Sequence, residues 1–123
     1  MAVLYAVLIF YFSSQSNLPE VARPIFAASD KVAHFLEFAF MGGLLFLTFA
    51  NAGWRPWDAP LAIALGAIYG ATDELHQVFI PGRTADTFDA LFNALGAVAA
   101  VLILAYLDHR MHPTQVPART GNA

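Results

Sequence analysis

The sequence predicts an all-α protein, a polytopic transmembrane bundle of about four helices in which the first helix is short. Of the 123 residues, 59% are hydrophobic and only 12% are charged, whereas a soluble domain carries about 25% charged residues. The mean hydropathy is also positive, at +0.58. Long apolar stretches alternate with short polar joints. We therefore expect one transmembrane domain over residues 1–110 and a flexible tail over residues 111–123.

Composition also excludes several classes of function. The chain has no cysteine, so disulfides and thiolate chemistry are excluded. The formal net charge is −3 and the basic residues form no cluster. We therefore expect no nucleic-acid partner.

The first helix is expected over Ala2 to Ser14. Its apolar part covers about twelve residues, short of the roughly twenty that a span needs. No positively charged segment precedes it and no small-residue cleavage site follows it, which disfavours a cleaved signal peptide. We interpret it as a membrane helix that either begins upstream of Met1 or continues through Ser16 at an interface. The joint from Gln15 to Ser29 contains two prolines and is expected to be a loop.

Three longer helices follow, and turn residues set their ends. The W-R-P-W-D turn separates the second from the third, and Pro81-Gly82 stops the third. The expected ranges are Asp30 to Ala50, Ala59 to Ile80 and Asp86 to Leu107.

The third helix is too short to span unless polar residues enter the membrane. Its charge-free part, Ala59 to Thr72, rises only about 21 Å against a hydrocarbon core of about 30 Å. The polar residues that follow, from Asp73 to Gln77, must then lie at or just below the headgroups. They need protein partners or a water-filled cleft.

Charged residues interrupt the helices in three segments, Ser29 to Glu37, Asp73 to Arg83 and Asp86 to Asn93. An ionisable group within a span costs a few kcal/mol, so it indicates a functional site by default. The segments fall at the start of the second helix, the end of the third and the start of the fourth. In an antiparallel bundle these ends lie together, so the three segments are expected to converge.

On the second helix, Asp30, His34 and Glu37 recur at i, i+4 and i+7 and share one stripe, with Lys31 beside them. Asp30 has an equally good role as a helix cap. Glu37 lies too deep for capping and needs a partner such as Lys31, His34 or Arg83.

On the third helix, Asp73, Glu74, His76 and Gln77 occupy the last turns. Carboxylates there face the negative end of the helix dipole, which destabilises their ionised form. Burial destabilises the ionised form further. This placement favours a function, with Asp73, Glu74 and His76 as hypothetical catalytic residues. The alternative is a buried ion-pair network with Arg83 and the neighbouring lysine that fixes helix packing.

On the fourth helix, Asp86, Asp89 and Asn93 recur at i, i+3 and i+7. Asp86 can cap the helix, whereas Asp89 and Asn93 lie too deep. Small residues on the last two helices allow close helix packing, which needs no function. The glycines concerned are Gly66, Gly70 and Gly96.

A metal site is a lesser alternative. Suitable ligand types are supplied by His34, His76, Asp73, Glu37 and Asp89. No paired H-E-x-x-H spacing is present, and the basic residues compete for the carboxylates. We therefore expect no cofactor and keep a divalent metal as the weaker interpretation. A histidine–carboxylate acid–base pair beside an arginine anion clamp remains open.

Topology follows from the arginines once Lys31 and Arg83 are set aside as parts of the charged segments. Three arginines on the side of both termini then oppose one on the other side. The positive-inside rule places both termini in the cytoplasm and the charged segments outside. The residues counted are Arg55, Arg110 and Arg119 against Arg23.

The charged motifs resemble those of the VanZ-like family of small bacterial membrane proteins. The resemblance covers most of the chain, and its most specific run is D-E-x-H-Q-x-F-x-P-G-R. The matching residues are the loop from Ser14 to Pro19, then Ser29, Asp30, Lys31, His34 and Phe35, then Asp73, Glu74, His76, Gln77, Phe79, Pro81, Gly82 and Arg83, and finally Asp89, Asn93 and Gly96.

The resemblance implies four helices that cross the bacterial inner membrane. The family's namesake confers resistance to the glycopeptide antibiotic teicoplanin, and other members occur without any resistance context. Family members commonly carry a tyrosine shortly after the His-Phe pair, where this chain has Phe38. Any role of that hydroxyl would be missing here.

Three functions are compatible with these features. The first is a cell-envelope protein that binds or modulates an anionic, lipid-linked or peptidoglycan-related ligand, with membrane lipids and an envelope precursor as partners. The second is a membrane-embedded acid–base enzyme, and the third is a structural accessory subunit. The predicted ligand-binding residues are Asp30, Lys31, His34, Glu37, Gln77, Arg83, Asp86, Asp89 and Asn93.

Overall fold

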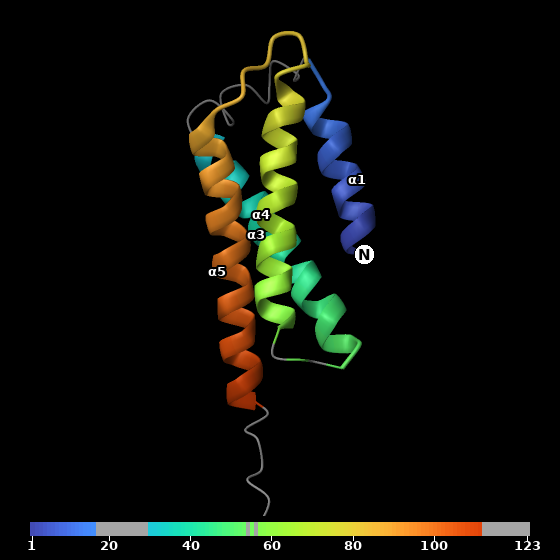
Figure 1. The fold of residues 1–123 in the computed structure, drawn as a ribbon, viewed down its shortest axis with the longest axis vertical. Coiled ribbons are helices and arrows are strands. Elements are labelled where there is room, and N and C mark those ends of the chain that lie inside the picture. The colour runs from blue at the N-terminus through green and yellow to red at the C-terminus, as the bar shows by residue number, and fades with distance from the viewer. Residues whose placement is uncertain (17–29, 54, 56, 112–123) are drawn as a thin grey trace, which may run out of the picture.

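The computed structural model describes residues 1–16, 30–53, 55 and 57–111, and this part of the chain is all-helical. It forms four helices, as predicted, and the first is short (Figure 1). Their bounds are α1 (Ala2–Ser13), α3 (Asp30–Asn51), α4 (Asp58–Gln77) and α5 (Thr87–Met111). Residues 17–29 of the predicted loop and residues 112–123 of the predicted tail lie outside the described residues.

Two helix ends differ from the sequence-based ranges by more than one residue. α4 ends at Gln77 instead of Ile80, because the backbone tightens there: Phe79 N donates to His76 O at 3.0 Å and Ile80 N to Gln77 O at 3.1 Å. The turn is completed by Gly82, whose φ of 81° favours glycine. α5 extends to Met111, four residues beyond the expected Leu107, so the helix enters the segment predicted as a tail.

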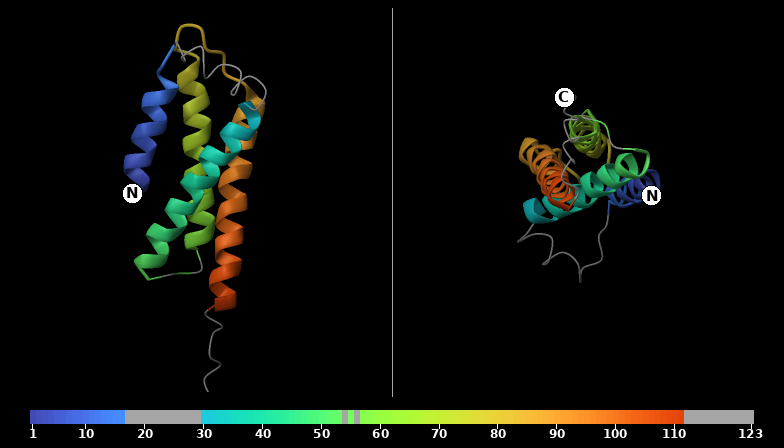
Figure 2. Two further views of the ribbon diagram at one scale, coloured as in Figure 1. Left: turned by 180° about the vertical axis from the view of Figure 1, so that it is seen from behind. Right: turned by 90° about the horizontal axis from the view of Figure 1, so that it is seen from below.

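The three long helices form the bundle, and α1 lies beside the upper half of α4 in the view of Figure 1. α3 crosses the other helices obliquely, as the view from behind shows (Figure 2). The C-terminal ends of α1 and α4 and the N-terminal ends of α3 and α5 meet at one end of the molecule. This arrangement confirms that the three charged segments converge.

Glycines permit the close approach of the long helices at the level of this end. A Cβ on Gly70 would lie 2.6 Å from the Cβ of Asn93, and a Cβ on Gly96 would overlap the carbonyl oxygen of Phe35. α4 and α3 therefore each approach α5 closely enough for polar side chains to meet between them. This is the packing role predicted for Gly70 and Gly96.

Tyrosine hydroxyls attach the short helix α1. Tyr69 of α4 donates to the carbonyl oxygen of Ala6 at 2.6 Å, and Tyr5 of α1 donates to that of Glu37 at 3.3 Å. Ile9, only 2% exposed, packs in the same cluster as Phe38. α1 thus closes one side of the polar end.

The surface of the bundle is apolar, as a lipid-facing surface must be. α3 and α5 are long and apolar enough to cross a membrane, with hydropathies of 1.7 and 2.2 over 18-residue windows. Only 28% and 22% of these windows are buried, unlike the core helices of soluble proteins. Large apolar side chains such as Ile68 and Ile103 are about three-fifths exposed, at 62% and 58%. The chain is a membrane protein.

Candidate functional site

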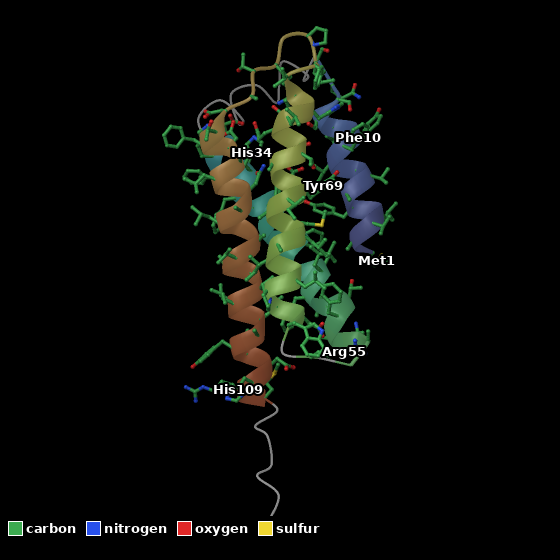
Figure 3. All side chains as sticks on the ribbon, in the orientation of Figure 1. Met1, Phe10, His34, Arg55, Tyr69 and His109 are labelled. Atoms are coloured by element: carbon green, nitrogen blue, oxygen red, sulfur yellow. The ribbon has the colours of Figure 1, made fainter. Side chains whose placement is uncertain are left out.

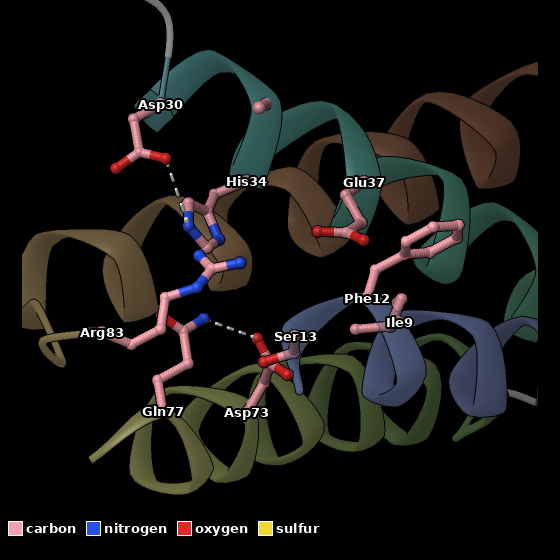
Figure 4. Close-up of a pocket in the computed structure, with 10 residues that line it drawn as sticks. Ile9, Phe12, Ser13, Asp30, His34, Glu37, Asp73, Gln77 and Arg83 are labelled. Atoms are coloured by element: carbon pink, nitrogen blue, oxygen red, sulfur yellow. Dashed lines mark hydrogen bonds and ion pairs between the residues drawn. The ribbon is translucent and has the colours of Figure 1, made fainter. Parts of the chain in front are cut away.

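A cavity of about 300 Å³ opens at the polar end of the bundle (Figure 4). α1 supplies a largely apolar wall, while α3, α4 and the loop after α4 supply polar groups. Six of the predicted site residues line the cavity together. They are Asp30, His34, Glu37, Asp73, Gln77 and Arg83.

Arg83 is the cationic group of this cavity. The Pro81-Gly82 turn delivers it, and its backbone N donates to the carbonyl oxygen of Ile80 at 3.1 Å. Its guanidinium points into the cavity, towards Glu37 on the far wall (Figure 4). Within the described residues this guanidinium forms no ion pair. The ion pairs there involve Lys31 and His34 as the basic partners.

Two buried carboxylates keep one oxygen without a hydrogen bond to any described residue. Asp73 is 5% exposed; its Oδ2 accepts from Gln77 Nε2 at 3.2 Å, while its Oδ1 is unpartnered. Glu74 is also 5% exposed; its Oε2 accepts from the backbone N of Asp86 at 3.2 Å, while its Oε1 has no hydrogen bond and lies 3.8 Å from His34 Nδ1. An unpartnered buried polar group costs about 1–3 kcal/mol. A passive ion-pair core leaves the free oxygen of Asp73 unexplained.

His34 is held between α3 and α5 by Asn93. His34 Nδ1 lies 3.0 Å from Asn93 Oδ1, and Asn93 Nδ2 donates to the carbonyl oxygen of Gly70 at 3.3 Å. Asn93 is fully buried. The other ring nitrogen, Nε2, lies 3.7 Å from Asp30 Oδ1 and 3.7 Å from Asp89 Oδ2. The structure thus brings the predicted residues of α3 and α5 into one cluster.

Lys31 forms a separate ion-pair group beside the cavity. Its Nζ donates to Asp86 Oδ2 and to Asp89 Oδ1. Asp86 also caps α5 by accepting from the backbone N of Phe88 at 2.8 Å. The Lys31 ammonium, with this backbone bond, holds the pKa of Asp86 below its ordinary value of 3.8. Lys31 and Asp86 thus fasten the start of α5 to α3.

His76 lies apart from the cavity, on the side of α4 that faces α1. Its ring stacks on Phe10 with centroids 4.5 Å apart, and its Nε2 lies 3.0 Å from Ser14 Oγ. Because the Ser14 hydroxyl donates to the carbonyl oxygen of Phe10 at 2.6 Å, Nε2–H of His76 is the donor to Ser14.

The structure separates the basic residues of the charged segments. Arg83 and His34 line the cavity, whereas Lys31 and His76 do not. Lys31 is occupied by carboxylates, and His76 packs against α1. The proposed acid–base residues Asp73 and His76 likewise have different partners.

Sequence reasoning missed the contribution of α1. Ile9, Phe12 and Ser13 line the cavity, and Ser13 Oγ is buried with no hydrogen bond to any described residue. The available signal was a serine pair, Ser13-Ser14, at the end of an otherwise apolar helix.

The residues that could hold a metal ion also differ from those considered in the sequence. One ligand atom each from Asp30, His34 and Asp89 lies within 4.8 Å of the others. Asp30 was not in the sequence-based ligand set, and His76, Glu37 and Asp73 do not belong to this group in the described part of the chain.

Comparisons with known proteins identify the family. Searches of the curated proteins and of the solved structures each returned no match. The VanZ/LLP1 family model matches residues 1–108, which include α1, α3, α4 and nearly all of α5. The match confirms the resemblance noted in the charged motifs, and the chain belongs to the VanZ/LLP1 family.

Proposed function

We propose that this VanZ-like envelope protein binds the head group of an anionic, lipid-linked ligand in the cavity at its polar end. The observation that carries the proposal is the Arg83 guanidinium, which faces the cavity without an ion-pair partner among the described residues. A planar guanidinium fork matches a phosphate or carboxylate in two parallel hydrogen bonds.

The carboxylates of the cavity favour a ligand that carries hydrogen-bond donors as well as an anionic group. Glu37 and Asp73 line the cavity with Arg83, and Asp73 keeps an unpartnered oxygen there. A bare phosphate dianion would be repelled by these groups. A ligand that combines an anion with hydroxyl or amino donors satisfies both, with the anion on Arg83 and the donors on Asp73 and Glu37. Phosphate-linked sugars and amino-bearing head groups have this chemistry.

The apolar wall supports a lipid-linked ligand over a free solute. Ile9 and Phe12 of α1 line the cavity, and the Phe12 side chain is 57% exposed. The apolar part of a ligand can therefore run along α1 while its head group lies in the cavity. We place this end outside the cytoplasm in a protein that crosses the bacterial inner membrane several times. Arg55 lies at the opposite end (Figure 3), and Arg110 is in the last turn of α5, so the positive-inside rule supports a cytoplasmic location for that end.

A titration with a defined probe tests the proposal. The protein in detergent is titrated with a polyprenyl phosphosugar, whose phosphodiester is a monoanion and whose sugar carries hydroxyl donors, and, separately, with the matching polyprenyl glycoside that lacks the phosphate. Binding is followed by microscale thermophoresis. We expect the phosphosugar to bind and the glycoside to bind at least tenfold more weakly. Arg83→Gln should abolish this preference, and Arg83→Lys should weaken it because a point charge replaces the fork.

Arg110→Gln is the matched control. Arg110 is an exposed arginine near the end of α5, where it contacts Tyr106 at 2.9 Å, far from the cavity. This variant changes the net charge as Arg83→Gln does and should bind like the wild type. Equal affinity for the phosphosugar and the glycoside, or equal losses in both arginine variants, would contradict the proposal.

A further inference from the structure

We propose that Asp30, His34 and Asp89 form a divalent transition-metal site beside the cavity. This site is inferred from the arrangement of its three side chains, which does not depend on the proposed lipid ligand. Metal binding can therefore be measured without any lipid. Two of its residues are at least nine-tenths buried, with His34 9% and Asp89 5% exposed. Asp30 lies at the start of α3 with its side chain 52% exposed, which gives access from the cavity.

The hydrogen bonds of Asn93 fix which nitrogen of His34 is free. Asn93 Nδ2 must face the carbonyl oxygen of Gly70, because the opposite amide orientation would oppose two acceptors. Its Oδ1 therefore faces His34 Nδ1 at 3.0 Å. An amide oxygen only accepts, so Nδ1 carries the hydrogen. A neutral imidazole then presents its lone pair at Nε2.

This lone pair points at two carboxylate oxygens. Nε2 lies 3.7 Å from Asp30 Oδ1 and 3.7 Å from Asp89 Oδ2, and neither contact is a hydrogen bond. Three electron-rich atoms that converge in a buried site repel one another unless a cation lies between them. Ligand atoms held tetrahedrally at about 2.1 Å from an ion are about 3.4 Å apart. The two distances from Nε2, 3.7 Å each, are close to this value, and all three ligand atoms lie within 4.8 Å of one another.

Neighbouring residues orient the ligands through hydrogen bonds, as the residues around a bound metal do. Asn93 orients the imidazole through Nδ1–H, and Lys31 holds the second oxygen of Asp89. The surroundings are also negatively charged, as a bound divalent cation requires. The carboxylates of Asp30, Asp86 and Asp89 outnumber the Lys31 ammonium, and Glu74 Oε1 lies 3.8 Å from His34 Nδ1.

The ligand types favour Zn²⁺ or Mn²⁺ over Mg²⁺ or Ca²⁺. An imidazole nitrogen suits the transition metals, whereas Mg²⁺ and Ca²⁺ prefer oxygen ligands throughout. Three protein ligands leave at least one coordination position open, and Asp30 and His34 place it at the cavity that they also line.

Isothermal titration of the metal-stripped protein in detergent with Zn²⁺, Mn²⁺ and Mg²⁺ tests the site. We expect one equivalent of Zn²⁺ or Mn²⁺ to bind at least tenfold more tightly than Mg²⁺. Asp30→Asn removes one ligand at an exposed position and should weaken Zn²⁺ or Mn²⁺ binding by at least about tenfold. Asp108→Asn, which removes a carboxylate near the other end of α5, should leave binding unchanged.

Two further measurements are needed. The first separates the loss of a metal ligand from misfolding, and the second shows whether His34 Nε2 binds a metal or a proton. Asp30→Asn should keep the wild-type circular dichroism spectrum and melting temperature in the absence of metal. In ¹⁵N-histidine-labelled protein, Zn²⁺ should shift the Nε2 signal of His34 while Nδ1 keeps its hydrogen. Absence of saturable binding, equal affinity in Asp30→Asn and wild type, or a His34 ring doubly protonated at neutral pH and unmoved by Zn²⁺ would overturn the proposal.

Discussion

Two adjacent glycines of α3 test how the bundle holds its polar end together. A Cβ on Gly42 would lie 2.8 Å from the carbonyl oxygen and 2.9 Å from the Cα of Ala97 on α5. These are backbone atoms and cannot rotate away. A Cβ on Gly43, one residue further, would meet only the Cδ1 of Leu104, at an ordinary distance of 3.6 Å. Gly42→Ala and Gly43→Ala therefore add the same methyl group to the same helix in different surroundings.

The expected magnitudes follow from these distances. Gly42→Ala must separate α3 from α5 by about 0.6 Å, and a gap of this size forfeits roughly a quarter to a half of each facing dispersion contact. Overpacking of this kind costs about 1–3 kcal/mol. Both substitutions gain up to about 1 kcal/mol of helix propensity, which cancels in their comparison. The free energy of unfolding of Gly42→Ala should thus lie about 1–3 kcal/mol below that of Gly43→Ala.

Reversible unfolding in mixed micelles of a mild detergent and sodium dodecyl sulfate, followed by far-UV circular dichroism, measures this difference. Gly43→Ala should be as stable as the wild type or more stable. If the two variants unfold at the same detergent composition, α3 and α5 do not approach as closely as described.

Three further predictions follow from single contacts. Lys31 lowers the pKa of Asp86, so the stability that this carboxylate contributes is complete above its ordinary pKa of 3.8 and is lost as the pH falls through its lower pKa in the folded protein. The melting temperature of the wild type should therefore fall more between pH 7 and about pH 3 than that of Asp86→Asn. Tyr69→Phe removes the hydrogen bond to Ala6 and should lower the free energy of unfolding by about 0.5–1.5 kcal/mol, which the same micelle assay measures. Asn93→Leu leaves the buried Nδ1–H of His34 without its acceptor and should lower the free energy of unfolding by about 1–3 kcal/mol, while the far-UV circular dichroism spectrum stays helical. An unchanged free energy of unfolding would show that the amide does not hold the imidazole.

The sequence predicted the helices and the convergence of the charged segments, because both follow from local patterns. Hydropathy and the breakers Pro81 and Gly82 define the helices, and antiparallel connection alone brings the polar ends together. The identity of individual pairs could not be predicted. Spacing places Lys31 and His34 near each other on α3 but cannot show that Lys31 turns to α5 while His34 meets Asn93.

The position of His76 outside the cavity could not be predicted for a related physical reason. The motif that contains it places His76 and Gln77 on adjacent positions, about 100° apart around the helix. Which of the two faces the cavity depends on where α1 docks. The contacts that dock it, from Tyr69 to Ala6 and from Phe10 to His76, join residues more than sixty positions apart. No local pattern encodes them.

Native mass spectrometry of the protein released from its own membranes tests most directly that the cavity is a ligand site. Wild type, Arg83→Gln and Arg110→Gln are compared under identical detergent conditions. We predict an additional mass of a phosphate- or carboxylate-bearing lipid on the wild type and on Arg110→Gln, and its loss from Arg83→Gln. Bare protein in all three samples, or the same bound mass in all three, would contradict the account and assign the polar cluster to helix packing alone.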